Sequence, residues 1–428
     1  MKGRVEALFD RIGRCVAETG GEAYFVGGCV RDLLRGVPIK DLDLALEGDT
    51  HAAGKRLANA LRGHVFWLHQ EERVVRVILP EHDGLHVDLS PLRGTLEQDL
   101  QARDLTINAM AVAAADGLHP GVPILDPTGG QRDLAAGLVR FVQETAPRED
   151  PLRVLRALRF RWLLDFQLTP ETAALARECG PLLARVSVER VRDELFQVLA
   201  LRSADRALRE CLELGLSRWL FGAEVPEPER SADRVGTLLE LLDAAPPAVS
   251  DLLDQPVTPP RRRRESLAWA AALQPHLPAL DPAAAGRYLA LSNDERHLIE
   301  KGLAAAPRLR ELAARWPVSG RERYRAFRGG GRALPEAVLL AAAADGGWSA
   351  AYAELLEEAL WRHQRPPEPL LTGQEVMQAL KLRPGPQIGR LLEEIEEARA
   401  DGMLRTRDEA LAYLLERHGG TAPEPRSP

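Results

Sequence analysis

Two aspartates in an alternating apolar segment are the residues of this sequence best placed to do chemistry. Asp41 and Asp43 flank Leu42 in the run Asp-Leu-Asp-Leu-Ala-Leu. Residues two apart in an extended strand point to the same face, so both carboxylates converge on one spot. Hard divalent cations relieve the repulsion of such a pair by taking oxygen ligands. The spacing predicts that Asp41 and Asp43 are catalytic metal ligands, with Mg²⁺ as the cofactor, although an isolated Asp-x-Asp is also a common solvated strand end.

A glycine turn precedes the two acids. Gly27 and Gly28 follow a predicted strand, Ala23–Val26, and begin a helix-like stretch that contains Arg31. Glycines let the backbone amides of a helix N-terminus approach phosphate groups closely. We therefore expect Gly28 and Arg31 to bind a nucleoside triphosphate. Two metal ions beside it, roughly 3.5 to 4 Å apart, suit an in-line phosphoryl displacement.

The order of these elements is more specific than either one alone. The run Gly-Gly-Cys-Val-Arg-Asp-Leu-Leu-Arg-Gly, followed by Asp-Leu-Asp, resembles the head-domain signature of the class II tRNA nucleotidyltransferase and bacterial poly(A) polymerase family. The resemblance implies an α/β nucleotidyltransferase head, a mixed sheet with helices, followed by an all-α neck, body and tail. It also implies an enzyme that uses CTP or ATP and acts on an RNA 3′ end.

Residues 102–111 resemble the second motif of the family, with alanine where its first arginine is usual. Arg103 can bind phosphate through two N–H groups of its planar guanidinium, and Asp104 can accept hydrogen bonds from ribose hydroxyls. Asn108 is expected one helical turn beyond Asp104. The alternative is an Asp-capped helix with a solvent-facing asparagine. A third catalytic acid is expected from Asp88, in the alternating run at residues 85–89; Asp104 is the other candidate for that role.

A helix expected over residues 149–160 carries a pair suited to reading bases. Asp150 and Arg153 are three residues apart, so on a helix they present an acceptor beside a fork of donors. Cytosine and adenine each offer an amino donor beside a ring-nitrogen acceptor, which matches this pair. Uracil and guanine offer a carbonyl and a ring N–H there, so buried donors and acceptors would be left unpaired at a cost in binding free energy. An ion pair on a solvated helix face is the alternative. The pair resembles the Glu-Asp-x-x-Arg element by which CCA-adding enzymes select CTP and ATP.

The resemblance implies nucleotide contacts for two further arginines of this helix, Arg156 and Arg159. Glu189 and Arg190 are expected to brace the helix.

Residues 90–100 depart from the family pattern, because the flexible loop of many CCA-adding relatives is absent or severely shortened. Its loss resembles the CC-adding members. We rank CC addition to the tRNA 3′ end first, CCA addition second and addition of A alone third. Less favoured functions are those of a poly(A) polymerase, a nucleotide-transferring modifier of proteins and a non-catalytic RNA-binding protein.

Composition predicts a cytoplasmic enzyme of several domains with no membrane partner. The 428 residues carry a net charge of −7, so phosphate binding must come from local clusters of arginine. Two basic stretches, at residues 261–264 and 321–332, are expected to be solvated faces or RNA contacts.

The oligomeric state is not defined by the sequence. The expected divisions are a head at residues 1–144, a neck at 145–201, a body at 202–365, a tRNA-binding tail at 366–418 and a disordered end at 419–428.

Overall fold

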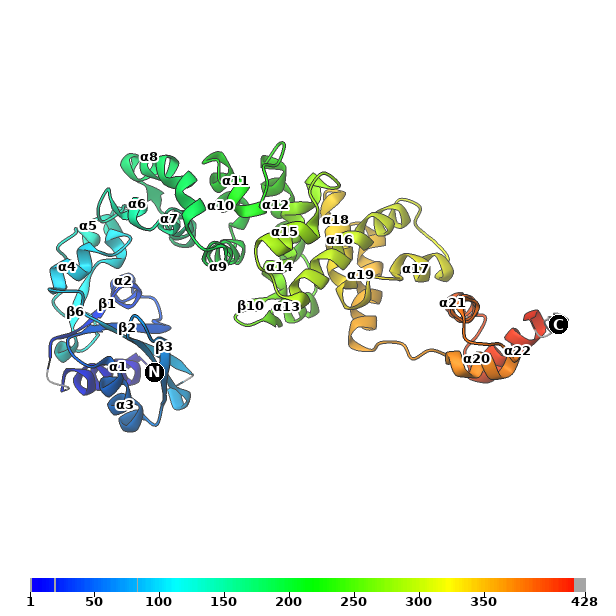
Figure 1. Ribbon diagram of the computed structural model, residues 1–428, viewed down its shortest axis with the longest axis horizontal. Helices are drawn as coiled ribbons and strands as arrows, with labels where there is room; N and C mark the ends of the chain where they lie inside the picture. The colour runs from blue at the N-terminus through cyan, green and yellow to red at the C-terminus, as the bar shows by residue number, and fades with distance from the viewer. Residues whose placement is uncertain (1, 19–20, 83, 419–428) are drawn as a thin grey trace, which may run out of the picture. The chain divides into compact units, whose positions relative to one another are not determined.

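The computed structural model describes residues 2–18, 21–82 and 84–418 (Figure 1). The chain forms two compact units. One comprises Met1–Leu195 with Glu210–Trp219, and the other comprises Phe196–Arg209 with Leu220–Pro428. The end expected to be disordered lies outside the described residues. Across the described ranges, no helix combines the length and apolar character that crossing a membrane requires.

The head of the first unit is built on a six-stranded mixed sheet in the order β3-β4-β5-β2-β1-β6. Strands β2 and β5 are parallel, and the other neighbours are antiparallel. The strands expected at residues 23–26, 41–46 and 85–89 all form, as β1, β2 and β5. The elements are α1 (Lys2–Ala17), β1 (Ala23–Val26), α2 (Gly28–Arg35), β2 (Asp41–Leu46), α3 (Thr50–Leu61), β3 (His64–His69), β4 (Val74–Leu79), β5 (Leu85–Pro91), α4 (Leu96–Gln101), β6 (Ala111–Ala113), α5 (Gly130–Ala135) and β7 (Leu138–Val139).

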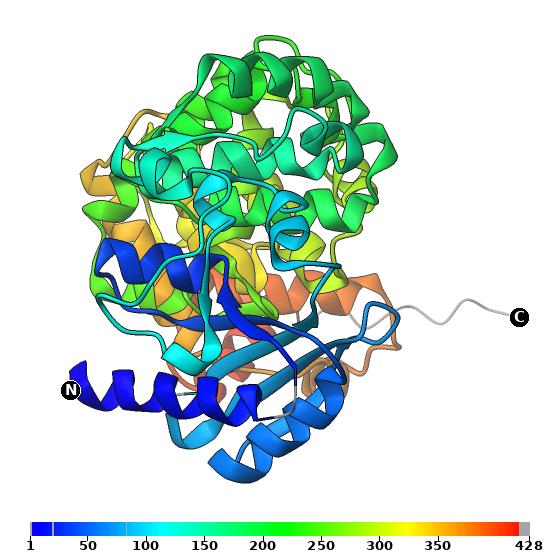
Figure 2. The same ribbon diagram turned by 90° about the vertical axis from the view of Figure 1, so that its left-hand side faces the viewer.

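The two faces of the sheet differ in burial because its strands alternate. Leu42 and Leu44 are fully buried, together with Val75 and Val77 of β4, in the core beneath α1 and α3. Figures 1 and 2 both show α1 and α3 on the same side of the sheet. Burial of this apolar surface, worth about 25 cal/mol per Å², fixes the strand register. Asp41 and Asp43 therefore lie on the other face, hereafter the open face.

The neck begins with a short helix and a break rather than with one long helix. Helix α6 ends at Glu149, Asp150 is extended with φ −133° and ψ 96°, and α7 begins at Leu152. The expectation of a single helix from residue 149 is wrong at its start, because Pro151 disfavours a helical conformation in the residue before it. The neck elements are α6 (Ala146–Glu149), α7 (Leu152–Leu164), β8 (Gln167–Leu168), α8 (Pro170–Cys179) and α9 (Val188–Leu199).

The rest of the chain is almost entirely helical, as expected. Its elements are α10 (Ala204–Glu213), α11 (Ser217–Phe221), α12 (Glu229–Asp243), α13 (Pro247–Leu253), β9 (Pro256–Thr258), β10 (Arg261–Arg262), α14 (Arg263–Leu273), α15 (Pro282–Tyr288), α16 (Asn293–Ala313), α17 (Gly320–Phe327), α18 (Leu334–Ala344), α19 (Ala350–Gln364), α20 (Gly373–Leu380), α21 (Pro386–Ala400) and α22 (Arg407–His418). Helices α20 to α22 share a small apolar core centred on Val376, Ile395 and Leu414.

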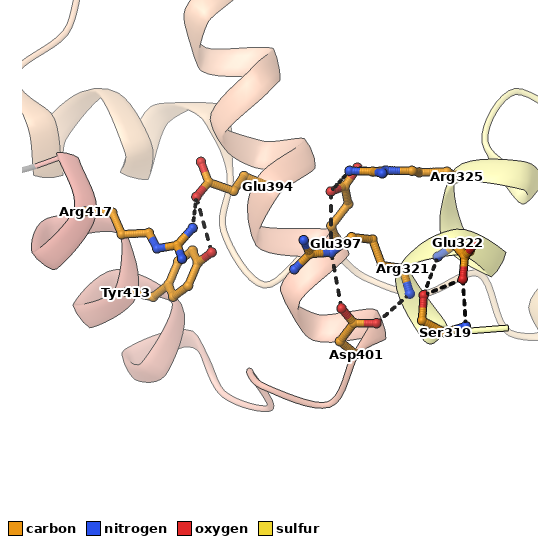
Figure 3. Close-up of polar contacts among 9 residues, drawn as sticks. All are labelled: Ser319, Arg321, Glu322, Arg325, Glu394, Glu397, Asp401, Tyr413 and Arg417. Atoms are coloured by element: carbon orange, nitrogen blue, oxygen red, sulfur yellow. Dashed lines mark hydrogen bonds and ion pairs between the residues drawn. The ribbon is translucent and has the colours of Figure 1, made fainter.

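Both basic stretches are paired with carboxylates inside the second unit. In the first, Arg261 and Arg263 contact Glu295 and Glu336, which are almost fully buried. In the second, Arg321 and Arg325 of α17 reach across to Glu397 of α21 (Figure 3). Arg262 and Arg325 still keep more than half of their side-chain surface exposed, so each stretch is solvated in part and ion-paired in part.

Candidate active site

Strand register places the acids side by side on the open face. Asp43 of β2 is in register with Asp88 of β5, and Asp41 with His86. Asp41 is exposed and Asp43 is half-buried. Asp41 and Asp43 therefore point to one side of the strand, as predicted. The proximity of Asp88 to Asp43 follows from the parallel pairing of β2 and β5.

Asp88 is neutralised by a neighbour that sequence reasoning missed. The Arg76 guanidinium donates from Nε and Nη2 to the two Asp88 carboxylate oxygens, each at 2.7 Å. Arg76 interrupts the otherwise apolar β4 at a position that shares the face of Asp88, and this break in the pattern was the available signal. Asp88 thus forms an ion pair beside the two aspartates of β2, and its role as third catalytic acid stays a prediction.

The electrostatics of Asp43 favour a cation at this position. Burial raises its pKa from the usual 3.8 to about 6, and the negative charges of Asp88 and Asp41 add to the effect, while Arg103 opposes it. Within the described ranges, no three His, Cys, Asp or Glu side chains gather closely enough to hold a metal. Mg²⁺ is commonly bound through one or two carboxylates, with water and substrate phosphates completing its octahedron. The oxygen donors of Asp41 and Asp43 fit that pattern.

The glycine turn brings the backbone close to both an acid and a guanidinium. Gly27 has φ +75°, in the left-handed region that favours glycine. A Cβ atom there would lie 3.3 Å from Arg103 Nη1 and 3.6 Å from Asp43 Oδ2. Arg31, in the first turn of α2, donates from Nη1 to Asn108 Oδ1 at 2.7 Å. The turn therefore links the first and second sequence motifs.

Residues 102–111 do not form an α-helix, which corrects the sequence interpretation. Helix α4 ends at Gln101, and residues 106–108 form a single 3₁₀ turn before β6. Asp104 and Asn108 are consequently not one α-helical turn apart. Asp104 is buried and accepts from Arg156 Nε at 2.8 Å and from the Leu105 N–H at 2.8 Å. Burial alone would raise the pKa of Asp104, but the Arg156 charge and these hydrogen bonds hold it below its usual value.

Asp150, which precedes α7, and Arg153, in the first turn of α7, contact different partners. Asp150 accepts from Arg190 Nη2 at 2.7 Å, which is the kind of bracing contact expected of Arg190. Arg153 donates to the carbonyl oxygens of Ala102 and Arg103 at 2.7 and 3.2 Å. The alternative of an ion pair between Asp150 and Arg153 on a solvated helix face is therefore not what forms.

Phe160 organises a cluster of arginines that the sequence did not reveal. The guanidinium carbons of Arg159, Arg31 and Arg156 lie 4.4, 5.1 and 5.8 Å from the centre of its ring. Such cation–π contacts hold guanidinium groups in place. Arg159 also forms an ion pair with Glu194, which is buried. Phe160 is buried, and its role as a platform for these guanidinium groups depends on the fold.

Two neighbouring cavities collect almost all of the predicted site residues. The larger, about 580 Å³, is lined by Gly28, Arg31, Asp41, Asn108 and Arg159 among others. The smaller, about 400 Å³, is lined by Asp150 and Arg153 among others. Both are lined by the same four residues: Asp43, Arg103, Asp104 and Arg156. An acid pair, a glycine turn and fixed guanidinium groups therefore surround one space that can hold a nucleotide.

This fold and site define a nucleotidyltransferase head joined to a helical arm. Comparison with known families agrees: residues 23–140 match the poly A polymerase head domain, and residues 165–230 match the probable RNA and SrmB-binding site of polymerase A. The chain is an enzyme of the tRNA nucleotidyltransferase and poly(A) polymerase family.

Relatives that match almost the whole chain are named for the addition of different nucleotides. The chain is 35% identical to the CC-adding tRNA nucleotidyltransferase of Geobacter sulfurreducens, over 96% of this chain and 95% of that protein. It is 33% identical to the A-adding tRNA nucleotidyltransferase of Deinococcus radiodurans, over 92% of this chain and 94% of that protein. The CCA-adding enzyme of Thermotoga maritima complexed with tRNA has the same fold, with a TM-score of 0.69 and 24% identity over 97% and 95% of the two chains.

Proposed function

We propose that this enzyme adds CMP from CTP to the 3′ end of tRNA without a nucleic-acid template, with the two-cytidine terminus CC as its product. CCA addition, with ATP as a second substrate, and addition of A alone are the alternatives. The observation that carries the proposal is the meeting of two cavities at Asp43 and Arg103. One side offers acids and a glycine turn, and the other offers the groups suited to reading a base.

In this proposal Asp41 and Asp43 hold Mg²⁺, together with oxygens from water and the triphosphate. When bound, the metal would favour ionisation of the attacking hydroxyl and stabilise the negative charge that develops on the leaving pyrophosphate. The tRNA 3′-hydroxyl attacks the α-phosphorus of the nucleotide, the bond to pyrophosphate breaks, and the hydroxyl proton passes to water. Because Asp43 lies between the two cavities, the reacting phosphate would sit where they join.

The chain's arginines would bind the triphosphate and orient it. Arg31 and Arg159 are held against the Phe160 ring, and Arg103 is held by Asp99 at 3.0 Å, so little side-chain entropy is lost on binding. Asp104 and Asn108 line the same space and supply acceptors for ribose hydroxyls. Asp150 and Arg153 would read the Watson–Crick edge of the base from the second cavity.

The short connection between β5 and α4 supports CC addition as the product. Only residues 92–95 separate the two elements, and Thr95 caps α4 with Gln98 in a reciprocal capping box. A segment this short and this firmly capped leaves no long flexible element beside the pocket to reshape it from a one-ring to a two-ring base. The full-length relative from Geobacter sulfurreducens, named CC-adding, agrees with this choice.

One assay separates CC, CCA, A and poly(A) addition. The protein is incubated with Mg²⁺ and tRNA transcripts that end before CCA, after C, after CC and after CCA, each with one labelled nucleoside triphosphate. A CC-adding enzyme labels the first two with CTP and leaves the CC-ended tRNA unlabelled by ATP. Labelling of the CC-ended tRNA by ATP would replace CC addition with CCA or A addition, and long tails from ATP would indicate a poly(A) polymerase. No labelling by any nucleotide would contradict the proposed function.

A further inference from the structure

A row of side chains crosses the open face from the candidate metal ligands to the edge of the sheet. The register pairs Asp43 with Asp88, Asp88 with Arg76, and Arg76 with Phe66 of β3. Because residues in register on adjacent strands point to the same face, these four side chains form one continuous line. Strand β3 is the edge strand, so Phe66 ends the line.

A second row runs beside the first, two residues away along each strand. Asp41 is in register with His86, His86 with Ile78, and Ile78 with His64. His86 Nδ1 lies 3.6 Å from Asp41 Oδ1. Together the rows form a strip with imidazole groups, one guanidinium and an aromatic ring, which starts at the candidate metal site.

Phe66 is exposed at a position where core packing does not need it. Its exposed fraction is 41%, whereas Val75 and Val77, on the opposite face of the neighbouring strand, are fully buried. Trp67, the next residue along β3, points to that opposite face, where it stacks on His51 with ring centres 4.7 Å apart. Phe66 is therefore the large apolar side chain that β3 presents on the face of the acids.

We infer that this strip is the docking surface for the single-stranded 3′ end of the RNA primer, and that Phe66 is a stacking platform for one of its bases. The inference rests on the proposed function, because it assigns a track to the RNA whose 3′-hydroxyl reacts beside Asp41 and Asp43. Aromatic side chains bind single-stranded RNA by stacking, and they tolerate any base because every base has a π-face. A platform of this kind suits a primer whose terminal bases change as nucleotides are added.

The dimensions of the sheet place Phe66 under an upstream nucleotide rather than the terminal one. Neighbouring strands lie about 4.8 Å apart, so the three steps from Asp43 to Phe66 span about 14 Å. That distance takes two nucleotides to cover when the 3′-hydroxyl is at the acids. Arg76, fixed by Asp88, lies one strand from Phe66 and two from Asp43, and it can donate to the primer backbone.

A second copy of the chain is the main competing occupant, because β3 is an edge strand with unpaired backbone groups. Pairing of two edges uses the backbone of β3 and does not require an aromatic residue on the acidic face. The continuity of the row with the candidate metal ligands therefore favours RNA.

The test compares Phe66→Ala with Trp67→Ala, a matched control on the same strand that is similarly exposed, at 37%, but faces the other way. Incorporation of CMP is measured with saturating CTP and varied tRNA, then with saturating tRNA and varied CTP. Binding of a fluorescent single-stranded oligoribonucleotide is measured separately, without CTP. Thermal unfolding and sedimentation confirm that each variant is folded and report its oligomeric state.

Phe66→Ala is expected to raise the KM for tRNA and the Kd for the oligoribonucleotide about tenfold, while the KM for CTP stays within twofold. Phe66→Tyr keeps an aromatic ring, so its KM for tRNA and its Kd for the oligoribonucleotide should equal those of the unmodified protein. Trp67→Ala should also leave both constants unchanged. Equal effects of the two alanine variants, or no change at Phe66, would overturn the inference, as would a change in sedimentation with an unaltered KM for tRNA. If the unmodified protein adds no nucleotide, the proposed function fails, and oligoribonucleotide binding still tests the platform.

Discussion

Arg325 of α17 forms a bidentate ion pair with Glu397 of α21: Nε lies 2.6 Å and Nη2 2.7 Å from the two carboxylate oxygens (Figure 3). One turn earlier, Arg321 Nε lies 3.1 Å from Asp401 Oδ2, and its backbone N–H donates to Asp401 Oδ1 at 2.7 Å. Arg328 contacts Glu393 one turn later. Two arginines of α17 and Arg328, the residue after it, therefore face two acids of α21 and Asp401, the residue after that helix, in antiparallel order. The ladder joins the last three helices to the rest of their unit.

The close approach of these helices gives a sharp test of the interface. A Cβ atom on Gly320 would lie 1.9 Å from the carbonyl oxygen of Ala400, so Gly320→Ala must push α17 and α21 apart. We expect a loss of about 1–3 kcal/mol in unfolding free energy, and faster proteolysis of the 365–371 connection. Gly389→Ala is the control: Gly389 lies in α21 with open space around it, so alanine should be neutral or stabilising. Equal stability of the two variants would contradict this account of the interface.

Sequence reasoning succeeded where one local pattern controls the outcome. The period of two in residues 41–46 specified both the strand and its faces, because a shift of one residue would bury Asp43 and expose Leu44. It failed where tertiary contacts decide. Arg76 was missed because its partner lies on another strand, and the contact of Asp104 with Arg156 of the neck was missed for the same reason.

The same limit applies to charge. The arginines at residues 321–332 look like a solvated basic face in one dimension, and only the fold brings acids from some 70 residues away to meet them. Asp150 likewise fell outside its expected helix because a proline follows it and Arg190 holds its carboxylate. Patterns within one element are readable from sequence, whereas charge partners between elements depend on topology.

Removal of one acid of β2 tests the proposed metal ligands. Asp41→Ala should lower CMP incorporation roughly a thousandfold, since a metal contributes several kcal/mol of transition-state stabilisation. Binding of tRNA, measured by filter retention, should change less than twofold. Mg²⁺ should raise the melting temperature of the unmodified protein and have little effect on the variant, because a ligand that binds only the folded state stabilises it. Full activity of Asp41→Ala would remove Asp41 from the metal site.

The raised pKa of Asp43 predicts a pH-dependent stability in the absence of metal. Between its usual value of 3.8 and about 6, folded Asp43 holds a proton that the unfolded chain has released. Stability therefore falls as pH rises through this window, and the loss, at most about 3 kcal/mol, is complete above it. Asp43→Asn should thus stabilise the metal-free protein at pH 8, with a gain that shrinks as the pH is lowered towards 4. Denaturant titrations at both pH values measure this, and an equal gain at both would contradict the electrostatic cause.

Base selection is tested at Asp150, with its partner as the control. Asp150→Ala removes the acceptor that matches the amino group of cytosine, so the preference for CTP over UTP should fall roughly 10- to 100-fold. Arg190→Ala leaves that acceptor in place and removes only the 2.7 Å contact that holds it, so this variant should lose turnover but retain selectivity. The measurement is kcat/KM for each of the four nucleotides on a tRNA that ends before CCA. If both variants relax selectivity equally, Asp150 acts only by anchoring Arg190. If neither does, the base is read elsewhere.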